Sequence, residues 1–304
     1  MPSFCHIIEE SIPPALRLDR YVAEHLRLLS RSQIKAREME GSINGKKVKL
    51  SRQVKQGDRV ELFWSEEEPS ALVPEDIPLE IIYEDERAVV IDKPQGMVVH
   101  PGAGNRRGTL ANALYHRRLA RNNTVNEGLR PGIVHRLDKD TSGVIIAAYD
   151  DEAHAFLAEQ FKSRAAKKTY IAIVGGNLKN SAGRIETLLS RDPGNRKRFA
   201  VTSNRGKNAL TLYRVIKTWR AHSLVLLRPK TGRTHQLRVH MRYLGHPITG
   251  DIIYGARDPL FPDATLMLHA RSLEITLPGE SAARTFKSPV PGRFRKMIHK
   301  LDRL

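Results

Sequence analysis

The sequence predicts an α+β fold divided into two domains, and two features of the chain carry this prediction. Apolar runs of strand length alternate with polar turns and with segments of helical periodicity along the 304 residues. Two basic blocks also flank an acidic segment that contains three prolines. We therefore expect a small domain at 14–64, a linker at 65–80 and a domain at 81–304 that is large enough to bury its own core.

The charge balance indicates a polyanionic partner. Lys and Arg number 51 against 33 acidic residues, a net charge of +18. Residues 17–59 carry 12 basic and 5 acidic side chains and residues 87–304 carry 39 and 16, whereas residues 66–86 carry 9 acidic side chains and no basic one. Nucleic acid is the first candidate for both basic blocks. A soluble basic protein without such a partner is the alternative.

Other classes of protein are disfavoured by what the sequence lacks. No apolar stretch approaches the ~18 residues of a membrane span, and the start, MPSFCHIIEE, has no basic residue followed by an apolar run. The single cysteine, Cys5, supports neither an internal disulfide nor a metal–thiolate site. We expect a cytoplasmic monomer with no membrane partner.

The first basic block begins with two expected helices. Apolar residues recur at helical spacing within Leu16–Leu26. Ser30 is a suitable N-cap for a second helix over Arg31–Glu40, which Gly41 would end. The run SINGKKVKL, with Asn-Gly at its centre, then predicts two short strands around a tight turn, and a last strand is expected at Arg59–Phe63.

This block resembles the S4 RNA-binding domain over about residues 16–62, in the run SRSQIKAREMEGSINGKKVKLSRQVKQGDRVEL. The resemblance implies a domain that grips RNA. Cationic side chains near the start of the second helix and on the hairpin would attract phosphate: Arg31, Lys35, Arg37, Lys46, Lys47 and Lys49. The alternative is a solvated basic face.

The second block opens with the run AVVIDKP, a buried strand that Pro94 would end, and GMVVHPG is expected as another strand. The glycines of GAGNRRG do not have the spacing of a dinucleotide fingerprint, and the chain has no Walker A sequence and no HExxH. These patterns argue against nucleotide-driven and zinc chemistry. No metal ligand set is expected, because His235 and His240 are five residues apart on an expected helix.

The stretch GIVHRLDKDTSGVIIAAYD is the richest in chemically useful groups. Val144–Tyr149 is an expected strand, and Asp150 or the next aspartate would cap a helix that runs to about residue 163. Arg136 and Asp138 are two residues apart, on one side of an extended chain. A carboxylate among cations should stay ionised at neutral pH. From the residues alone, a catalytic role and a salt-bridged aspartate in a turn are equally open.

Four motifs resemble those of the RluA-type pseudouridine synthases, in the same order: DKPQGMVVHP, HRLDKDTSG, KKTYIAIVGG and TGRTHQLRVHMRYLGHPITGDIIYG. The resemblance covers about Ile81 to Lys287, and it is greatest to the bacterial ribosomal large-subunit branch that carries an S4 domain. It implies a catalytic domain on a mixed, mostly antiparallel β-sheet with the active cleft across its middle. It also implies isomerisation of uridine to pseudouridine in RNA, without cofactor or metal.

The resemblance implies a role for each of four residues. Asp138 matches the nucleophile, and Arg136 the arginine that enters the RNA stack as the uridine leaves. Tyr170 matches the tyrosine that stacks on the base and is a candidate base, and Arg233 the arginine paired with the carboxylate. The residue chemistry agrees, since a carboxylate can capture or stabilise the cation formed when a glycosidic bond breaks.

Structural alternatives exist for two of these residues. Tyr170 could be a core aromatic on a strand. Arg233 could precede a helix that Thr234 caps and Gly245 ends, and bond to a carboxylate for structure alone. Two further arginines of that helix, Arg238 and Arg242, are expected to contact phosphate or solvent.

Large-subunit rRNA, within a pre-ribosomal large subunit, is the first candidate substrate. Transfer RNA is the second. A non-catalytic RNA-binding ribosome assembly factor is a rival, although it would not need Asp138, Tyr170 and Arg233 together. A methyltransferase or nuclease is another, although the chain shows neither a cofactor loop nor a carboxylate cluster for metals.

Overall fold

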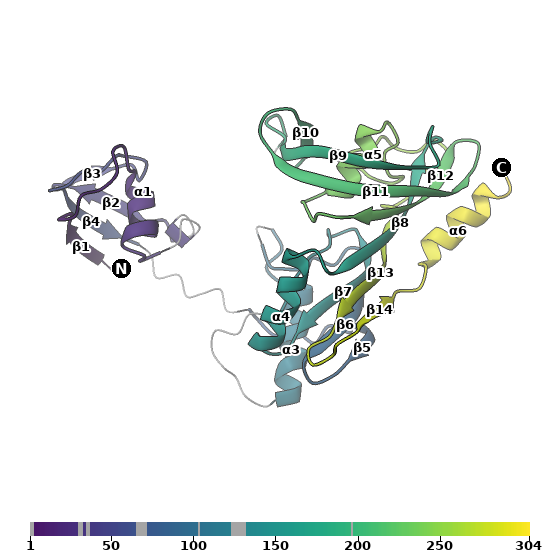
Figure 1. Cartoon of the computed structure of the whole chain (residues 1–304), viewed down its shortest axis with the longest axis horizontal. Coiled ribbons are helices and arrows are strands. Elements are labelled where there is room, and N and C mark those ends of the chain that lie inside the picture. The colour runs from purple at the N-terminus through teal and green to yellow at the C-terminus, as the bar shows by residue number, and fades with distance from the viewer. Residues whose placement is uncertain are drawn as a thin grey trace. The chain divides into compact units, whose positions relative to one another are not determined.

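The computed structural model describes residues 3–29, 33–34, 37–64, 72–102, 104–122, 132–195 and 197–304. The chain forms two compact units, residues 1–71 and 72–304 (Figure 1). The second unit therefore includes residues 72–80, which the charge pattern assigned to a linker.

The first unit contains a four-stranded antiparallel sheet in the order β1-β4-β2-β3. Its elements are β1 (Ser3–Ile7), α1 (Leu18–Arg20), the π-helical turn η1 (Tyr21–His25), β2 (Glu40–Ile43), β3 (Lys46–Val48) and β4 (Arg59–Phe63). The predicted first helix is confirmed as a helical segment that buries Leu18, Tyr21 and Val22. The predicted hairpin and last strand are also confirmed. The turn residues Asn44 and Gly45 have φ of 51° and 77°, as a primed hairpin turn requires.

The C-terminal half of the predicted second helix is wrong. Arg37 and Glu38 lie in a turn, and Glu40 already belongs to β2. Gly41 does not end a helix: it is buried in β2, where an added Cβ would lie 2.9 Å from the side chain of Leu18. Gly41 therefore serves close packing. Ser30, Arg31 and Lys35 lie outside the described residues.

The second unit contains, in its described part, a ten-stranded sheet in the order β10-β9-β11-β12-β8-β13-β7-β6-β5, with β14 paired to β13. Every pair of neighbours is antiparallel except β13 and β7, which confirms the predicted mixed, mostly antiparallel sheet. The strands are β5 (Glu80–Glu84), β6 (Ala88–Lys93), β7 (Ser142–Ala148), β8 (Lys167–Gly175), β9 (Ala182–Arg191), β10 (Phe199–Thr202), β11 (Lys207–Thr218), β12 (His222–Pro229), β13 (Leu268–Thr276) and β14 (Ala283–Lys287).

Helices cover the sheet of this unit on both faces. They are α3 (Leu110–Asn122), α4 (Asp151–Lys162), α5 (Gln236–Tyr243) and α6 (Gly292–Leu301). Leu157 of α4 and Ile146 of β7 belong to one core cluster, whereas Leu114 of α3 and Ile145 of β7 belong to another, so β7 is buried on both sides. This burial explains its continuous apolar run. The predicted cap is confirmed, because Asp150 accepts a hydrogen bond from the Ala153 N–H at 2.7 Å.

Within the described residues, no helix is both long enough and apolar enough to cross a membrane.

The prediction of a strand in GMVVHPG, residues 96–102, is wrong. This segment is a turn followed by irregular chain. Its carbonyl groups are used elsewhere, because those of Val98 and Val99 accept the first N–H groups of α3 and that of Met97 accepts the ammonium of Lys93. With these acceptors occupied, the segment joins no ladder.

Candidate active site

Asp138 lines a small cavity that is enclosed by distant parts of the second unit. The cavity has a volume of about 90 Å³ and is lined by the Arg136–Asp138 loop, β8, the end of β12, the loop before α5, and α5 itself. Arg136, Tyr170 and Arg233 also line it, so the four residues singled out from the motifs meet in one place. Because β8 is the central strand of the sheet order, the cavity lies at the middle of the sheet.

Arg238, and not Arg233, is the arginine paired with Asp138. Its Nη1 lies 3.5 Å from Asp138 Oδ2, and its side chain is only 6 % exposed. The expected pairing with Arg233 is therefore wrong, as is the expectation that Arg238 contacts phosphate or solvent. The reason is where the helix begins: α5 starts at Gln236, so Arg238 lies in its first turn and faces the cavity. Arg233 precedes the helix and donates to the carbonyl of Asn208 at 2.9 Å.

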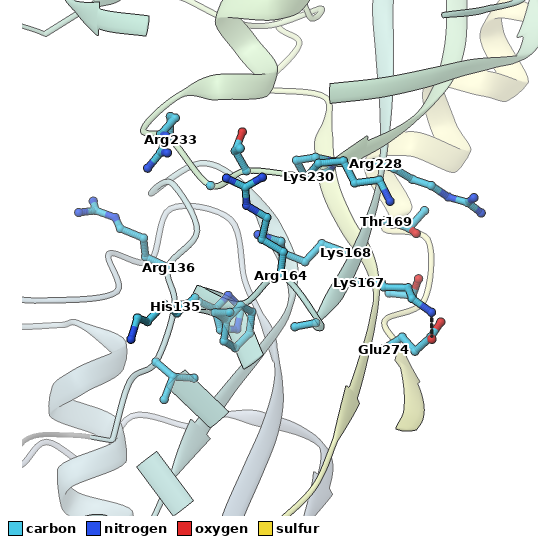
Figure 2. A pocket seen from close by; sticks show the side chains of 18 of the residues that line it. His135, Arg136, Arg164, Lys167, Lys168, Thr169, Arg228, Lys230, Arg233 and Glu274 are labelled. Atoms are coloured by element: carbon cyan, nitrogen blue, oxygen red, sulfur yellow. Dashed lines mark hydrogen bonds and ion pairs between the residues drawn. The ribbon is translucent and has the colours of Figure 1, made fainter. Parts of the chain in front are cut away.

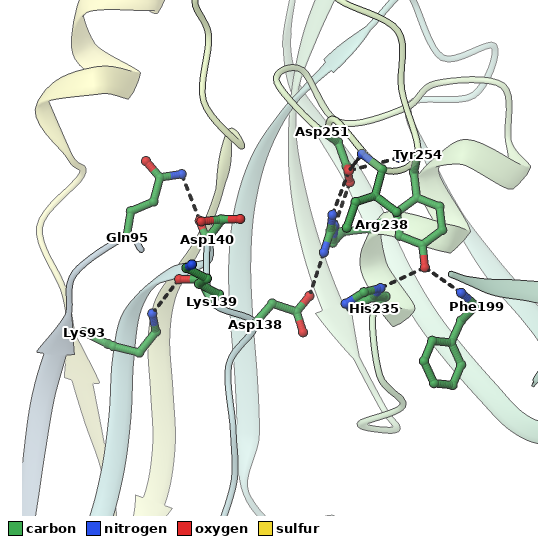
Figure 3. Close-up of polar contacts among 11 residues, drawn as sticks. Lys93, Gln95, Asp138, Lys139, Asp140, Phe199, His235, Arg238, Asp251 and Tyr254 are labelled. Carbon is green, nitrogen blue, oxygen red and sulfur yellow. Dashed lines mark hydrogen bonds and ion pairs between the residues drawn. The ribbon is translucent and has the colours of Figure 1, made fainter. Parts of the chain in front are cut away.

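A second carboxylate, that of Asp251, binds Arg238 on the side away from Asp138 (Figure 3). Asp251 is buried and accepts hydrogen bonds from Arg238 Nε and Nη2, both at 2.7 Å. It also accepts the backbone N–H groups of Ile253 and Tyr254 at 3.0 Å. The Tyr254 ring lies 5.1 Å from the guanidinium carbon of Arg238. The bidentate ion pair, the two amides and the ring fix the plane of the guanidinium.

Sequence reasoning did not single out Asp251 or Tyr254, although the signal was present. Both belong to GDIIYG, the end of the last quoted motif, where a carboxylate precedes two isoleucines. Tyr254 Oη accepts the backbone N–H of Phe199 at 2.8 Å and lies 2.8 Å from Nδ1 of His235. This cluster ties β10 and the start of α5 to the arginine that contacts Asp138.

Gln236 fixes the loop that precedes α5. Its Oε1 accepts the Thr231 hydroxyl at 2.6 Å and the Arg233 N–H at 3.0 Å, and its Nε2 donates to the carbonyl of Leu210 on β11 at 3.1 Å. The loop that carries Arg233 is thereby attached to the sheet. The N-cap of α5 is His235, at φ 55° and without a side-chain capping bond, so the expected cap at Thr234 is wrong. The predicted end at Gly245 is confirmed by its φ of 83° beyond the C-cap.

Tyr170 lies on β8, where it is buried and lines the same cavity as Asp138. Burial, together with the nearby charge of Asp138, raises the pKa of the Tyr170 phenol above its usual range. The ring is therefore a neutral phenol at physiological pH, able to stack on a base and to donate a proton.

The neighbours of Asp138 in the chain are held by buried polar groups. Lys93 is fully buried and donates to the carbonyls of Pro94 at 2.8 Å, Met97 at 2.8 Å and Lys139 at 3.1 Å. On the other side, Nε2 of His135 accepts the N–H of Ile146 at 3.0 Å. Burial lowers the pKa of His135 to about 3, so the ring is neutral. Both groups fix the loop and leave the carboxylate of Asp138 facing the cavity.

Of the cations of the first unit that are expected to contact RNA, the structure describes only some. Lys46 is exposed, and Lys47 forms an exposed ion pair with Glu40 at 2.6 Å. Arg37 is half-buried, and Arg31 and Lys35 lie outside the described residues. Over the described ranges, no group of three or more His, Cys, Asp or Glu side chains could hold a metal ion.

Comparison with known proteins gives consistent matches. The model of the RNA pseudouridylate synthase family matches residues 87–243. A Borreliella burgdorferi protein named ribosomal large subunit pseudouridine synthase D is 47 % identical over 92 % of this chain and 88 % of its own length. An uncharacterized RNA pseudouridine synthase of Aquifex aeolicus is 45 % identical over 83 % and 81 %. The structure of human RNA pseudouridylate synthase domain containing 4 superposes with a TM-score of 0.60 at 28 % identity, over 73 % of this chain and 93 % of the human one.

Proposed function

The chain belongs to the RNA pseudouridylate synthase family, and we propose that it converts specific uridines of large-subunit ribosomal RNA to pseudouridine with Asp138 as the nucleophile. The family match makes it an RNA-modifying isomerase. The choice of rRNA is supported by the name of the Borreliella burgdorferi relative, which aligns over nearly the whole chain.

The observation that carries the proposal is the position of the Asp138 carboxylate. It lies in a cavity with the neutral phenol of Tyr170, 3.5 Å from a guanidinium that is held in one orientation. In the reaction the N1–C1′ bond of uridine breaks, and the carboxylate captures or stabilises the cationic sugar. The uracil rotates in place, a C5–C1′ bond forms, the C5 proton leaves to solvent and N1 gains a proton. Reactant and product are isomers, so no redox partner is consumed.

The target uridine must leave its stack to reach Asp138, which costs a few kcal/mol. Arg136 is exposed and lies two residues before Asp138, at the rim of the same cavity. We assign it the role of filling the gap in the stack that the uridine leaves. Tyr170 is assigned the role of stacking on the extruded base. Arg233, on a loop fixed by Gln236, would contact the RNA beside the cavity.

The first unit would serve as an S4-type RNA grip. Its cations would contact phosphates and add affinity without sequence specificity: Arg31, Lys35, Arg37, Lys46 and Lys47. The full proposal is a monomeric, cytoplasmic enzyme that acts on the pre-ribosomal large subunit.

Tritium release tests this function. RNA that carries tritium at C5 of uridine loses the label only when C5 forms the new bond. We expect release from large-subunit rRNA taken from a strain that lacks the enzyme, and none with the Asp138→Asn variant, whose amide cannot act as an anionic nucleophile. Asp140→Asn, a neighbouring exposed carboxylate, is the matched control and should stay active.

Two outcomes would contradict the proposal. Asp138→Asn activity above a few per cent of wild type would remove Asp138 from the nucleophile role. Faster release from tRNA than from rRNA would replace the substrate.

A further inference from the structure

A second and larger cavity adjoins the cavity of Asp138. It has a volume of about 700 Å³ and lies between the end of α4, the start of β8, the end of β12, and β13 with β14 (Figure 2). The two cavities share Arg136, Lys168, Pro229 and the segment 231–233. A molecule that enters the cavity of Asp138 can therefore continue into this one, which we name the basic groove.

The charge of the basic groove is strongly one-sided. Its lining includes eight Lys and Arg side chains and one carboxylate: Arg136, Lys162, Arg164, Lys167, Lys168, Arg228, Lys230, Arg233 and Glu274. The carboxylate is already paired, because Lys167 Nζ lies 2.6 Å from Glu274. Within the described chain, Arg136, Arg164, Lys168, Arg228 and Lys230 have no carboxylate partner. A cavity that gathers cations without counter-charges is built for an anion.

Two of these cations are held in place at a conformational or solvation cost. Arg164 has φ of 66°, a left-handed conformation that is uncommon for a residue with a Cβ. In Figure 2 its guanidinium lies between Arg136 and Lys230. Lys168 is half-buried, and an added Cβ at Gly232 would lie 3.5 Å from its ammonium nitrogen. An anion in the groove would compensate for the solvation that the Lys168 ammonium loses on burial.

We propose that the basic groove binds the backbone phosphates of the single RNA strand next to the target uridine. This inference rests on the proposed function, since a uridine within an RNA strand remains joined to a phosphate on each side. A volume of 700 Å³ is in the range of a site for one ligand of drug size, so it admits about one or two nucleotides and no duplex. Cations on phosphate set affinity and orientation, and they do not select the base.

The test removes two groove cations that the reaction itself does not use. The groove variant is Arg164→Ala with Lys230→Ala, and Lys230→Gln alone replaces it if the double variant unfolds. The control variant is Arg295→Ala with Lys296→Ala, two exposed cations of α6 outside both cavities. All are compared in the Asp138→Asn background by fluorescence anisotropy with a uridine-containing single-stranded oligoribonucleotide, over a series of salt concentrations.

We expect the groove variant to bind about 25-fold more weakly at 0.1 M salt, and its salt slope to fall by about 1.4, because each lost phosphate contact on a single strand contributes about 0.7 to that slope. The control variant should match the parent. In the active background the groove variant should raise KM for tritium release and leave kcat unchanged.

Affinity and slope equal to those of the control variant would overturn the inference. So would a fall in kcat at unchanged KM, or displacement of the RNA by poly-glutamate at lower concentration than by unlabelled RNA, which would indicate an acidic protein partner. Binding is read without turnover, so it separates this inference from the proposed function. If wild type released no tritium but the groove variant lost affinity and salt slope as expected, the proposed function would be contradicted. The inference that the basic groove binds RNA phosphates would still be supported.

Discussion

Arg238 is shared between two carboxylates, and the sharing is unequal. Toward Asp251 it makes two short hydrogen bonds in a bidentate pair, whereas toward Asp138 it offers one nitrogen at 3.5 Å. Asp251 is fully buried and is satisfied by two further backbone N–H groups, which offsets the cost of burying its charge. Asp138 is thereby oriented by a fixed cation but only weakly held, and its carboxylate stays accessible from the cavity, as the proposed mechanism requires.

This arrangement predicts unequal effects for two conservative substitutions. Arg238→Lys keeps the charge but loses the planar fork that bonds to both carboxylates. We expect kcat to fall on the order of 10²-fold, as when one preorganised charge-stabilising donor is lost, with KM nearly unchanged. Arg233→Lys removes no ion pair with Asp138 and should act mainly on KM. Steady-state tritium release measures both, with thermal unfolding to check the fold. Full activity of Arg238→Lys, or an equal loss of kcat in Arg233→Lys, would show that the wrong arginine has been assigned.

At this scale the motifs predicted which residues meet but not how they bond. Arg136, Asp138, Tyr170 and Arg233 line one cavity because the loop before β7, strand β8 and the loop before α5 meet there. The partner of Asp138 could not be predicted, since TGRTHQLR contains two arginines five residues apart. Which of them faces the carboxylate depends on where α5 begins, and that is set by a left-handed histidine and by Gln236 rather than by a recognisable cap.

Among the elements, β6 and the chain that follows it determine the position of the loop that carries Asp138. Lys93, the last residue of β6, carries an ammonium with three hydrogens that meet three carbonyls, one of them on the residue after Asp138. The Gly96 N–H donates to the same Lys139 carbonyl at 2.9 Å, and Gln95 Nε2 donates to that of Asp140. One strand end thus holds the loop through side chain and backbone together.

Lys93 should give stability a specific pH dependence. Burial lowers the pKa of Lys93 from 10.5 to about 8, against the opposing charges of Asp140 and Asp138. Between these two values the unfolded chain binds more protons than the folded one, so this residue's contribution to stability rises with pH. We expect the unfolding free energy of wild type minus that of Lys93→Met to increase by up to about 1.4 kcal/mol per pH unit in that window. Urea unfolding at pH 7.5 and pH 9.5 measures the difference. A difference that falls with pH would mean that the folded state favours the protonated form more than the unfolded chain does.

In the elements that were predicted correctly, the local sequence and the tertiary environment favour the same structure. Strand β7 is an apolar run buried on both faces, α4 has an aspartate cap, and the Asn-Gly hairpin requires two left-handed residues, so local sequence and tertiary environment agree. The failures occur where the environment overrides local preference. Residues 96–102 have strand-like composition, but their carbonyls bond to Lys93 and α3. Gly41 resembles a helix stop, but it is needed beneath Leu18.

For the whole molecule, the division into two units, between residues 71 and 72, falls within the predicted linker 65–80, and the residues after it have contacts in the second unit. The Asn112 side chain donates to the carbonyl of Val73 at 2.7 Å, and the backbone carbonyl of Asn112 accepts the Glu75 N–H at 3.2 Å. Leu79 packs against the main core of the second unit. Residues 72–80 are therefore part of the second unit's structure, although their acidic and proline-rich composition is that of a linker. The composition of a segment indicates its charge and solvent exposure. It does not show whether side chains from other elements bind the segment's backbone, as Asn112 binds that of Val73.

Two truncations test whether the first unit contributes only RNA binding and the second unit contributes the catalytic residues. The second unit holds every proposed catalytic residue and has cores that share no residue with that of the first. Deletion of residues 1–71 should therefore leave a folded protein that isomerises uridine at high RNA concentration. It should bind RNA more weakly and with a shallower dependence on salt, because fewer counterions are released. Deletion of residues 1–80 also removes the segment bonded to Asn112 and the first residue of β5, so it should unfold at a lower temperature than the shorter deletion.

Thermal unfolding and the salt dependence of oligoribonucleotide binding, measured on both fragments and on the full chain, separate the outcomes. Equal melting temperatures for the two fragments would mean that residues 72–80 do not stabilise the second unit and act as a linker. Affinity and salt slope of the shorter deletion equal to those of the full chain would mean that the first unit is not an RNA grip. Normal binding with complete loss of tritium release would place part of the catalytic machinery in the first unit, because a fragment that retains Asp138, Tyr170 and Arg238 and still binds RNA should otherwise turn over.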